Sequence, residues 1–322
     1  MTEYRPAILD DYQQVSADYA DWTSVGADGV SVTVFSTPFA SESAVIQALL
    51  DFDIIVAMRE RTPFPRAVLA NLPRLKLLIT TGAANAAIDL AAAEECGVTV
   101  CGTGGSPSAA PELTWALLLA LARNLTAEEN ALRAGRWQNT VGFELARKTL
   151  GIVGLGKIGH KVAAYAHAFG MNVLAWSQNL DAATAEAAGV RKVSKDQLFR
   201  ESDIVTLHLR LSQRSEGTVG EAELRLLGPG GMLINTARGP LVNQPALIRA
   251  LEEGWIRGAA VDVYDQEPLP AGHPLLSAPN TVLTPHLGYV TYESYAQFYG
   301  GALEDVKAWL AGAPVRQLTR QQ

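Results

Sequence analysis

The stretch Thr149-Leu-Gly-Ile-Val-Gly-Leu-Gly-Lys-Ile-Gly159 decides the fold, because closely spaced glycines join a short apolar run to a helical pattern. The glycines follow a Gly-x-Gly-x-x-Gly spacing. Gly154 permits a tight turn, Gly156 lets the backbone approach a pyrophosphate, and Gly159 lets the helix pack close to the strand. A helix that begins here offers unpaired N–H groups to an anion. The sequence therefore predicts a dinucleotide-binding strand–turn–helix unit.

The next predicted strand, Asn172–Trp176, carries the information on the type of dinucleotide. An acidic residue at the end of this strand usually binds the adenosine ribose. Here Ser177, Gln178 and Asn179 follow instead, and no carboxylate is present. Either NAD or NADP is therefore possible. NAD or dual use is slightly favoured because no arginine follows the strand, and Arg191 or Lys192 would have to approach in the fold to bind a 2′-phosphate. The predicted cofactor contacts in this half of the motif are Gly154, Leu155, Gly156, Lys157, Ile158, Gly159, Ser177 and Gln178.

Strand-like and helix-like patterns alternate on both sides of this motif, which is typical of βαβ units with a parallel sheet. Further strands are predicted at Pro6–Leu9, Val30–Phe35, Asp53–Met58, Leu75–Thr80, Val98–Cys101, Asp203–Leu207, Gly231–Asn235, Gly258–Val263 and Val282–Thr284. Helices are predicted from Ser41 or Ser43, and at Pro65–Asn71, Ala87–Cys96, Pro111–Arg123, Ala127–Gly135, Pro245–Glu253 and Tyr292–Leu310. The predicted fold class is α/β, with two doubly wound parallel-sheet domains. The dinucleotide-binding domain is expected at 106–287. The other domain is expected at 1–105 plus 288–322, because the last helix has no sheet of its own.

Composition narrows the class of protein. The chain has 322 residues, of which 48% are hydrophobic and 18% charged, and this is ordinary for a folded enzyme. A net charge of −7 argues against a nucleic-acid partner. The two cysteines, Cys96 and Cys101, are interpreted as small buried residues of a protein in a reducing cytoplasm. No signal peptide or membrane span is visible, and the most apolar stretch, Leu113–Ala122, is expected to be a buried helix.

Three segments at the ends of predicted strands carry residues suited to hydride transfer at a carbonyl. They are 234–239 (Ile-Asn-Thr-Ala-Arg-Gly), 262–268 (Asp-Val-Tyr-Asp-Gln-Glu-Pro) and 284–288 (Thr-Pro-His-Leu-Gly). Such a reaction needs a proton donor, and His286 suits this role because histidine exchanges its proton near neutrality. Glu267 is the candidate carboxylate that would favour the imidazolium. The planar guanidinium of Arg238 matches a substrate carboxylate.

The order of these segments after the glycine motif resembles the D-isomer-specific 2-hydroxyacid dehydrogenase family, and the likeness covers nearly the whole chain. The resemblance implies two Rossmann-like domains with the active site in the cleft between them, commonly as a homodimer. It implies catalytic roles for Arg238, Glu267 and His286, with no metal. It also places Asp262 near the nicotinamide. The remaining implied cofactor contacts are Thr236, Ala237, His286 and Gly288. The region Ala127–Ala146 resembles the family's dimerisation arm.

Three departures from the family pattern are visible. The substrate loop, usually Gly-x-Gly-x-Asp-Asn/His, reads Gly82-Ala-Ala-Asn-Ala-Ala87 here, although backbone N–H groups near Gly82 and Ala83 are still expected to hold the carboxylate. The usual His-x-Pro is His208-Leu-Arg210, which leaves Arg210 unexplained. The usual Val-Ala-Glu after the hinge is Ala110-Pro-Glu112, which is compatible with the first turn of a helix.

Two segments bear on the substrate. By resemblance, the loop with Arg59 and Arg61 approaches the substrate. Either arginine could bind an extra carboxylate or phosphate, and Arg59 is the predicted contact, although a surface or interdomain ion pair is the favoured interpretation of these two arginines. An aromatic series, Tyr292, Tyr295, Phe298 and Tyr299, has helical spacing and is interpreted as a packing stripe. Tyr289 is close enough to His286 in sequence to line the pocket.

The predicted function is NAD(P)-dependent reduction of a small 2-keto acid to the D-hydroxy acid, or the reverse oxidation. The alternative is a dinucleotide-sensing binding protein or corepressor-like relative without turnover, which would not need Arg238, Glu267 and His286 together. Formate dehydrogenases of the family have Gln at the position of Glu267, which counts against that branch. Phosphite oxidation is not excluded by the motifs. The sequence does not identify the substrate side chain, the choice between NAD and NADP or the physiological direction.

Overall fold

A computed structural model describes residues 4–25 and 32–319 of the chain. It divides into two compact units, Met1–Ser106 with Val290–Gln322, and Pro107–Tyr289. The second segment of the first unit contains the long terminal helix α12 (Tyr292–Leu310).

The first unit is built on a five-stranded parallel sheet in the order β2-β1-β3-β4-β5. The strands are β1 (Pro6–Ile8), β2 (Thr33–Val34), β3 (Ile54–Ala57), β4 (Leu77–Thr80) and β5 (Thr99–Gly102). The short helices are α1 (Ser16–Tyr19), α2 (Glu42–Leu49), α3 (Arg66–Leu69) and α4 (Leu90–Glu95), with a 3-10 turn at Trp22–Val25. β3 and β4 are buried along their whole length, as expected for central strands covered on both faces.

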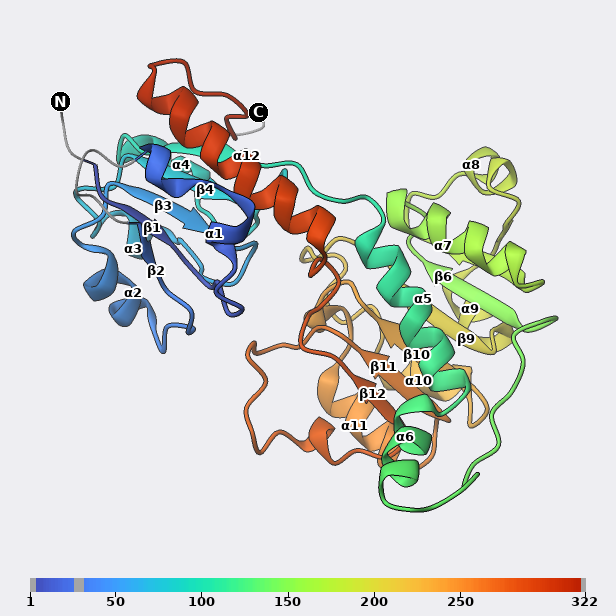
Figure 1. Cartoon of the computed structure of the whole chain (residues 1–322). Coiled ribbons are helices and arrows are strands. Elements are labelled where there is room, and N and C mark those ends of the chain that lie inside the picture. Colours follow the sequence, from blue (N-terminus) through green and yellow to red (C-terminus); the bar gives the residue numbers. More distant parts are fainter. Residues whose placement is uncertain (1–3, 26–31, 320–322) are drawn as a thin grey trace. The chain divides into compact units, whose positions relative to one another are not determined.

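Helix α12 completes the first unit by lying across its sheet (Figure 1). Thr291 caps its first turn by accepting a hydrogen bond from the Ser294 N–H. Tyr295, Phe298 and Tyr299 are buried, which confirms the predicted packing stripe for three of its four members. Tyr292 was wrongly included in that stripe, because it is 81% exposed at the first position of the helix.

A buried carboxyl on the same helix makes the stability of the first unit depend on pH. Asp305 is fully buried, and its Oδ1 accepts a hydrogen bond of 3.0 Å from Arg316 Nε. Within the described residues, its Oδ2 has no hydrogen-bond partner. Burial raises the Asp305 pKa from 3.8 to about 6, against the attraction of Arg316. A carboxyl group whose pKa is raised on folding contributes its full stabilisation of the folded state below the unfolded-state pKa. This contribution is lost as the pH rises through the folded-state pKa.

We therefore expect Asp305→Asn to gain stability relative to the parent protein as the pH rises. Asparagine stays neutral, so it does not lose this contribution at about pH 6. The melting temperatures of both proteins, measured from about pH 4 to about pH 7.5, check this. A difference between the two that stays constant over this range contradicts the expectation. Glu304→Gln, at an exposed neighbouring carboxylate that also pairs with Arg316, is the matched control.

The second unit has a seven-stranded parallel sheet in the order β12-β11-β10-β9-β6-β7-β8. The strands are β6 (Thr149–Val153), β7 (Asn172–Trp176), β8 (Arg191–Lys192), β9 (Ile204–Leu207), β10 (Met232–Asn235), β11 (Gly258–Val261) and β12 (Thr281–Leu283). The strand order reverses between β6 and β9, as in a doubly wound nucleotide-binding sheet. Ligands bind at the carboxyl ends of the strands at such a switch point.

Helices cover both faces of this sheet (Figure 1). One buried cluster packs under α5 and α7, and the other under α9, α10 and α11. The helices are α5 (Ala109–Ala122), α6 (Leu125–Arg133), α7 (Lys157–Ala168), α8 (Ala182–Ala187), α9 (Lys195–Glu201), α10 (Glu221–Leu227) and α11 (Gln244–Glu252), with 3-10 turns at Gly239–Leu241 and Pro274–Leu276. The two parallel-sheet units confirm the predicted fold class.

Several local expectations need correction. Cys96 was expected to be buried but is exposed at the end of α4, whereas Cys101 is buried, and both thiols are free. The two-residue strand β8 was not predicted. The strand expected from Val30 to Phe35 falls partly outside the described residues, and the described part contains only β2.

The stretch Leu113–Ala122 lies in the largely buried helix α5. No helix within residues 4–25 and 32–319 combines the length and apolar character that a membrane crossing requires.

Candidate active site

The glycine-rich turn after β6 has the geometry that its spacing predicts. Gly154 has a φ of +103°, which favours glycine, and its N–H donates to the Trp176 carbonyl at the end of β7 (2.8 Å). A Cβ on Gly159 would lie 2.3 Å from the Gly154 carbonyl oxygen, so helix α7 can approach the turn only with glycine there. A Cβ on Gly156 would meet no atom within 4 Å.

These three positions fit a dinucleotide. Gly156 is the N-cap of α7, and a Cβ there would meet no protein atom within 4 Å, so no contact within the protein requires glycine at this position. The first N–H groups of α7, a twelve-residue helix, are the donors that a pyrophosphate requires. The residues from Gly154 to Gly159 would therefore hold the pyrophosphate of NAD or NADP.

The end of β7 is polar and carries no acidic group. Ser177 is half-buried and Gln178 is exposed. The nearest following carboxylate, Asp181, caps α8 by accepting hydrogen bonds from the N–H and Oγ1 of Thr184, both at 2.7 Å. Arg191, a proposed partner for a 2′-phosphate, instead pairs with Glu201 on α9.

The three catalytic segments leave adjacent strands at the same edge of the sheet. Asn235, Val261 and Leu283 are partners in register and are the last residues of β10, β11 and β12. The segment after β10 is braced by buried Asn235, whose Nδ2 donates to the Arg238 carbonyl (2.9 Å) and whose Oδ1 accepts from the Ala237 N–H (3.1 Å). The Arg238 side chain is half-buried and donates from Nη1 to the Ala237 carbonyl (2.7 Å).

His286 and Glu267 form a close pair. The His286 Nδ1 lies 2.7 Å from Glu267 Oε2, and Glu267 Oε1 accepts the Tyr264 N–H at 2.9 Å. Because an ionised carboxylate can only accept, the hydrogen in the pair belongs to Nδ1, and Nε2 is left as the atom that exchanges a proton with a ligand. His286 has a φ of +53°, an uncommon backbone conformation that is often found at functional sites.

Tyr264 supports the pair of His286 and Glu267 by linking the ends of two neighbouring strands. Its hydroxyl lies 3.1 Å from the Val261 carbonyl and 3.0 Å from the Thr284 carbonyl, so it joins the ends of β11 and β12. Burial raises the Tyr264 pKa well above its usual range, so the phenol stays a neutral donor. A Cβ on Gly239 would lie 2.2 Å from the Tyr264 carbonyl carbon, which shows how closely the segment with Arg238 packs against the segment with Glu267.

Asp262 fixes the loop that carries His286. Its Oδ1 accepts hydrogen bonds from Thr284 Oγ1 (2.6 Å) and the Leu287 N–H (2.7 Å), and its Oδ2 accepts the Gly288 N–H (3.0 Å). The side chain is fully buried, and burial raises the Asp262 pKa although these hydrogen bonds oppose the shift. Asp262 therefore positions His286, and its predicted contact with the nicotinamide remains a prediction.

Three further predicted cofactor contacts, Thr236, Ala237 and Gly288, lie at this edge, and polar groups of Thr236 and Gly288 already form hydrogen bonds within the protein. Thr236 Oγ1 lies 2.7 Å from Thr114 Oγ1 on α5, and the Gly288 N–H is taken by Asp262. Ala237 is half-buried beside Arg238. These three residues remain predicted contacts through their other atoms.

In the first unit, the predicted substrate residues Arg59 and Gly82 lie together. Arg59 donates from its N–H to Thr81 Oγ1 (2.9 Å) and from Nη1 to the Thr81 carbonyl (3.2 Å). Its Nη1 is 1.8 Å from the position that a Cβ on Gly82 would occupy. The N–H of Gly82 was expected to hold a carboxylate, but it donates to Thr103 Oγ1 at 2.8 Å. Of the two backbone N–H groups expected to hold the carboxylate, that of Ala83 therefore remains the candidate donor.

The altered loop after Gly82 is organised by Asn85, a residue that the sequence analysis did not single out. Its buried Nδ2 donates to the Arg59 carbonyl (2.6 Å) and to Thr80 Oγ1 (2.9 Å). Its Oδ1 accepts the Ala87 N–H at 2.8 Å. One amide thus joins the two loops that follow β3 and β4.

Sequence reasoning also missed Asn235, Tyr264 and Thr284 as supports of the site. A signal existed for Asn235 and Thr284, because each is a polar residue at or just after the carboxyl end of a predicted strand. Tyr264 gave no signal of this kind, since its role depends on a hydroxyl reaching between two strands.

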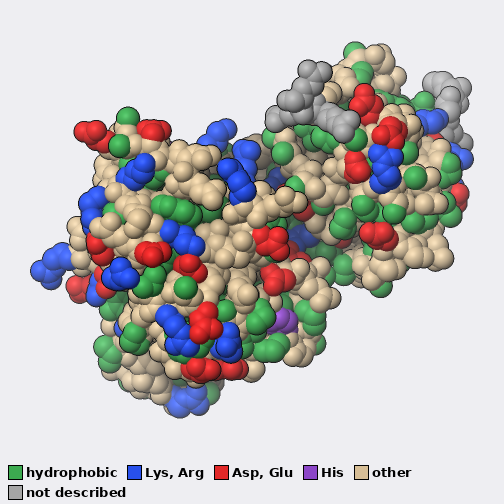
Figure 2. Space-filling view, turned by 180° about the vertical axis from the view of Figure 1, so that it is seen from behind, with side chains coloured by type: hydrophobic (Ala, Val, Ile, Leu, Met, Phe, Trp, Pro, Cys, Tyr) green, Lys and Arg blue, Asp and Glu red, His purple; other side chains and the backbone are tan. Residues whose placement is uncertain are grey.

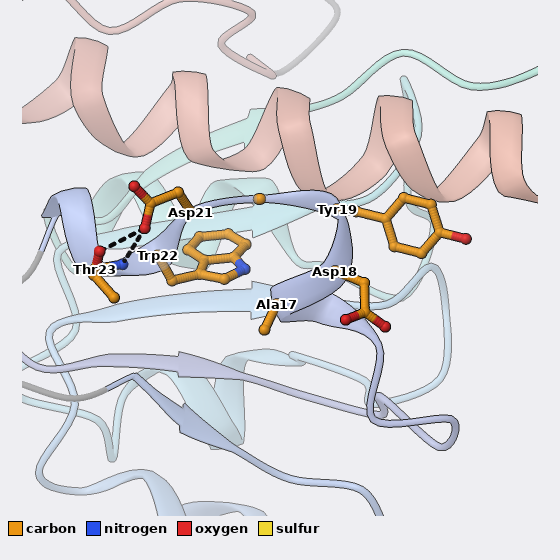
Figure 3. A pocket seen from close by; sticks show the side chains of 7 residues that line it. Ala17, Asp18, Tyr19, Asp21, Trp22 and Thr23 are labelled. Carbon is orange, nitrogen blue, oxygen red and sulfur yellow. Dashed lines mark hydrogen bonds between the residues drawn. The ribbon is translucent and has the colours of Figure 1, made fainter.

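A separate hollow of about 450 Å³ occurs in the first unit. One continuous segment, 17–23, lines it, and Asp21 accepts hydrogen bonds from the N–H and Oγ1 of Thr23 there (Figure 3). It contains none of the predicted site residues, and its acidic and aromatic lining lacks a cation for an acid substrate.

Comparison with known proteins agrees with this geometry. Residues 115–288 match the family described as D-isomer specific 2-hydroxyacid dehydrogenase, NAD binding domain. A glyoxylate reductase of Aeropyrum pernix is 37% identical over 255 residues, which cover 76% of each chain. A D-3-phosphoglycerate dehydrogenase of Methanocaldococcus jannaschii is 36% identical over 278 residues. The matched region covers 84% of this chain and 52% of that relative.

A solved structure is similar throughout. The phosphoglycerate oxidoreductase of Vibrio cholerae superposes with a TM-score of 0.89 at 39% identity, covering 96% of this chain and 100% of that one. The matched family, the shared fold and the site geometry agree. The chain is a member of the D-isomer-specific 2-hydroxyacid dehydrogenase family, an oxidoreductase that uses NAD or NADP to interconvert 2-keto and 2-hydroxy acids.

Proposed function

We propose that the chain reduces glyoxylate, hydroxypyruvate or a similarly small 2-keto acid to the D-2-hydroxy acid, with Arg238, Glu267 and His286 as its catalytic residues. The observation that carries the proposal is the 2.7 Å contact between His286 Nδ1 and Glu267 Oε2, at the same sheet edge as Arg238. The names of the relatives, glyoxylate reductase and hydroxypyruvate reductase, support small substrates.

The protein's part in this reaction is binding and proton delivery. The bound nicotinamide supplies the hydride that is added to C2 of the keto acid. Arg238 binds the substrate carboxylate with its guanidinium and polarises the neighbouring carbonyl. His286 gives the proton on Nε2 to the carbonyl oxygen as negative charge builds there, and Glu267 stabilises the imidazolium before the transfer.

Residues of the first unit are proposed to bind the substrate as well. Arg59 and the Ala83 N–H are the candidate contacts, and Gly82 contributes through its conformation, with a φ of +95°, rather than through its N–H. This unit is accordingly proposed to be the substrate domain.

The contact between His286 and Glu267 suggests a mutational test of Glu267. We expect Glu267→Gln to lower kcat roughly 10²-fold while the affinity for the reduced cofactor changes little, because the amide cannot stabilise an imidazolium. Steady-state kinetics and fluorescence titration of the cofactor check this. Asp265→Asn is the control on the same segment. A kcat within about twofold of the parent value would remove Glu267 from its proposed role.

The substrate proposal is tested by the loss of nicotinamide absorbance with NADH and NADPH. The panel is glyoxylate, hydroxypyruvate, pyruvate, phenylpyruvate and a branched 2-keto acid. Turnover that is fastest with one of the first two supports the proposal. A preference for phenylpyruvate contradicts it and would assign Tyr289, whose ring centroid lies 5.6 Å from that of His286, to a larger pocket. No turnover despite cofactor binding would favour the sensor alternative.

We also propose that the protein is a homodimer. The region around α6 and the loop after it exposes apolar side chains at Leu125, Leu132, Trp137 and Val141, with the last two 77% and 87% exposed. Exposed apolar side chains that form one contiguous patch mark an interaction surface, and these four lie within one short stretch of the chain. We expect Trp137→Glu to shift the protein toward the monomer in sedimentation velocity. Tyr292→Glu, at an equally exposed aromatic residue on α12, should leave the assembly unchanged.

A cytoplasmic location without a nucleic-acid or membrane partner is proposed on composition. The net charge of −7 and the two free thiols support it. On the face drawn in Figure 2, basic and acidic side chains are interspersed, so that face offers no continuous basic surface for phosphates.

A further inference from the structure

The loop after β9 carries a cation that the proposed reaction does not use. The residues 208–210, His-Leu-Arg, stand where the family usually has His-x-Pro, and the Arg210 side chain is exposed. Arg210 therefore needs a role other than proton transfer or binding of the substrate carboxylate.

The position of this loop follows from Gly154. A Cβ on Gly154 would lie 2.8 Å from the carbonyl carbon and oxygen of His208 and 2.9 Å from the Leu209 nitrogen. On its other side, the Gly154 N–H donates to the Trp176 carbonyl. The glycine turn is thus held between the end of β7 and the start of the β9 loop, at the point where the strand order reverses. The adenosine half of a dinucleotide lies at this point in sheets of this type.

Arg210 is held at this edge by its backbone. Its carbonyl accepts a hydrogen bond from Ser215 Oγ (2.7 Å), and the same oxygen of Ser215 accepts the Ser212 N–H (2.8 Å). Half-buried His208 anchors the start of the loop through Thr206 Oγ1 (3.1 Å), and desolvation of its ring lowers the His208 pKa to about 3, so this ring stays neutral. The cations of this loop, Arg210 and Arg214, are therefore permanently charged guanidinium groups rather than titrating ones.

The described ion pairs of this unit are compatible with an anion near Arg210. Of the other cations around this edge, Arg191 pairs with Glu201, and Lys195 pairs with Glu223 at 2.7 Å. Within the part of the chain that the structure describes, Arg210 makes no ion pair. The end of β7 has no carboxylate that would repel a phosphate on the ribose, because Asp181 faces its own helix.

We propose that Arg210 binds the 2′-phosphate of the adenosine ribose, so that the chain prefers NADP(H) to NAD(H). Ser177 and Gln178 accept the ribose on the opposite side of the glycine turn. A guanidinium forms paired, charge-assisted hydrogen bonds with phosphate, which makes arginine suited to this group. The proposal depends on cofactor use alone and not on the identity of the keto acid.

Binding of two adenosine probes tests this without turnover. By calorimetry, the parent protein should bind adenosine 2′,5′-bisphosphate at least about tenfold more tightly than adenosine 5′-monophosphate. We expect Arg210→Gln to weaken the bisphosphate about ten- to hundredfold and to leave the monophosphate within about twofold. Arg214→Gln, an exposed arginine on the same loop, should change neither affinity.

Three results would overturn the proposal. A parent protein with no preference for the 2′-phosphate excludes the site. An equal loss of both probes in Arg210→Gln assigns the arginine to stacking on the adenine ring. A loss in Arg214→Gln instead of Arg210→Gln assigns the phosphate to another cation. Because no keto acid is present, each result is independent of whether the proposed substrates are turned over.

Discussion

Replacement of His286 by alanine is expected to lower kcat by about 10²–10⁴, which is the usual contribution of a positioned general acid. No other group on the described sheet edge can replace it. Asp262 is buried with both oxygens in use, and Glu267 accepts two hydrogen bonds. The affinity for the reduced cofactor should change little, because the substitution does not alter the glycine turn that is proposed to hold the pyrophosphate. Stopped-flow measurement of hydride transfer with saturating keto acid separates the two quantities.

The control for this variant is His167→Ala, at an exposed position on α7 where the ring reaches only the Ala188 carbonyl. It should keep the parent kcat. Turnover of His286→Ala within about tenfold of the parent value would assign proton delivery to water or to another group. The loop should stay folded in the variant, since Asp262 holds the backbone of residues 287 and 288 rather than the imidazole.

Replacement of Arg238 by glutamine is expected to lower kcat/KM for the keto acid roughly 10²–10³-fold, or about 3–4 kcal/mol. The reason is the loss of the guanidinium that is proposed both to bind the carboxylate and to polarise the carbonyl. KM should rise together with the fall in kcat, which distinguishes Arg238 from His286. Arg238→Lys should recover part of the binding but little of kcat, because an ammonium cannot bind both oxygens in one plane.

The matched control is Arg249→Gln, which removes an exposed arginine paired with Glu221 on the surface of the same unit. It should leave both kinetic constants unchanged, since exposed ion pairs contribute little. If Arg238→Gln raised KM without lowering kcat, the residue would bind substrate and transition state equally, and its proposed role in polarising the carbonyl would be wrong.

The parts of the structure that the sequence predicts are those governed by local rules. Glycine spacing predicted the turn after β6, because Gly154 and Gly159 each stand where a Cβ would collide with backbone atoms. Apolar runs predicted the positions of most strands, since a buried parallel strand must be apolar along its length. The pairing of His286 with Glu267 was predictable because β11 and β12 end at the same edge of the sheet.

The parts that it does not predict depend on contacts between loops that are distant in the chain. Asn85 became important only because β3 and β4 are neighbours, which brings the Arg59 carbonyl within reach of its amide. The Gly82 N–H looked available in the sequence, but Thr103 after β5 takes it. Tyr292 has the right helical spacing to be buried, yet it lies at the start of α12, where no neighbour covers it.

The return of α12 to the first sheet has a consequence for the order in which the protein forms during synthesis. The N-terminal strands leave the ribosome first, but helix α12, with its buried Tyr299, and Leu318, whose N–H donates to the Val100 carbonyl, are made roughly 200 residues after β5. The second unit is complete in sequence before then and is free to fold as it emerges. The unit begun first should therefore be finished last, and until then its apolar sheet is the part of the nascent chain most exposed to chaperones and to aggregation.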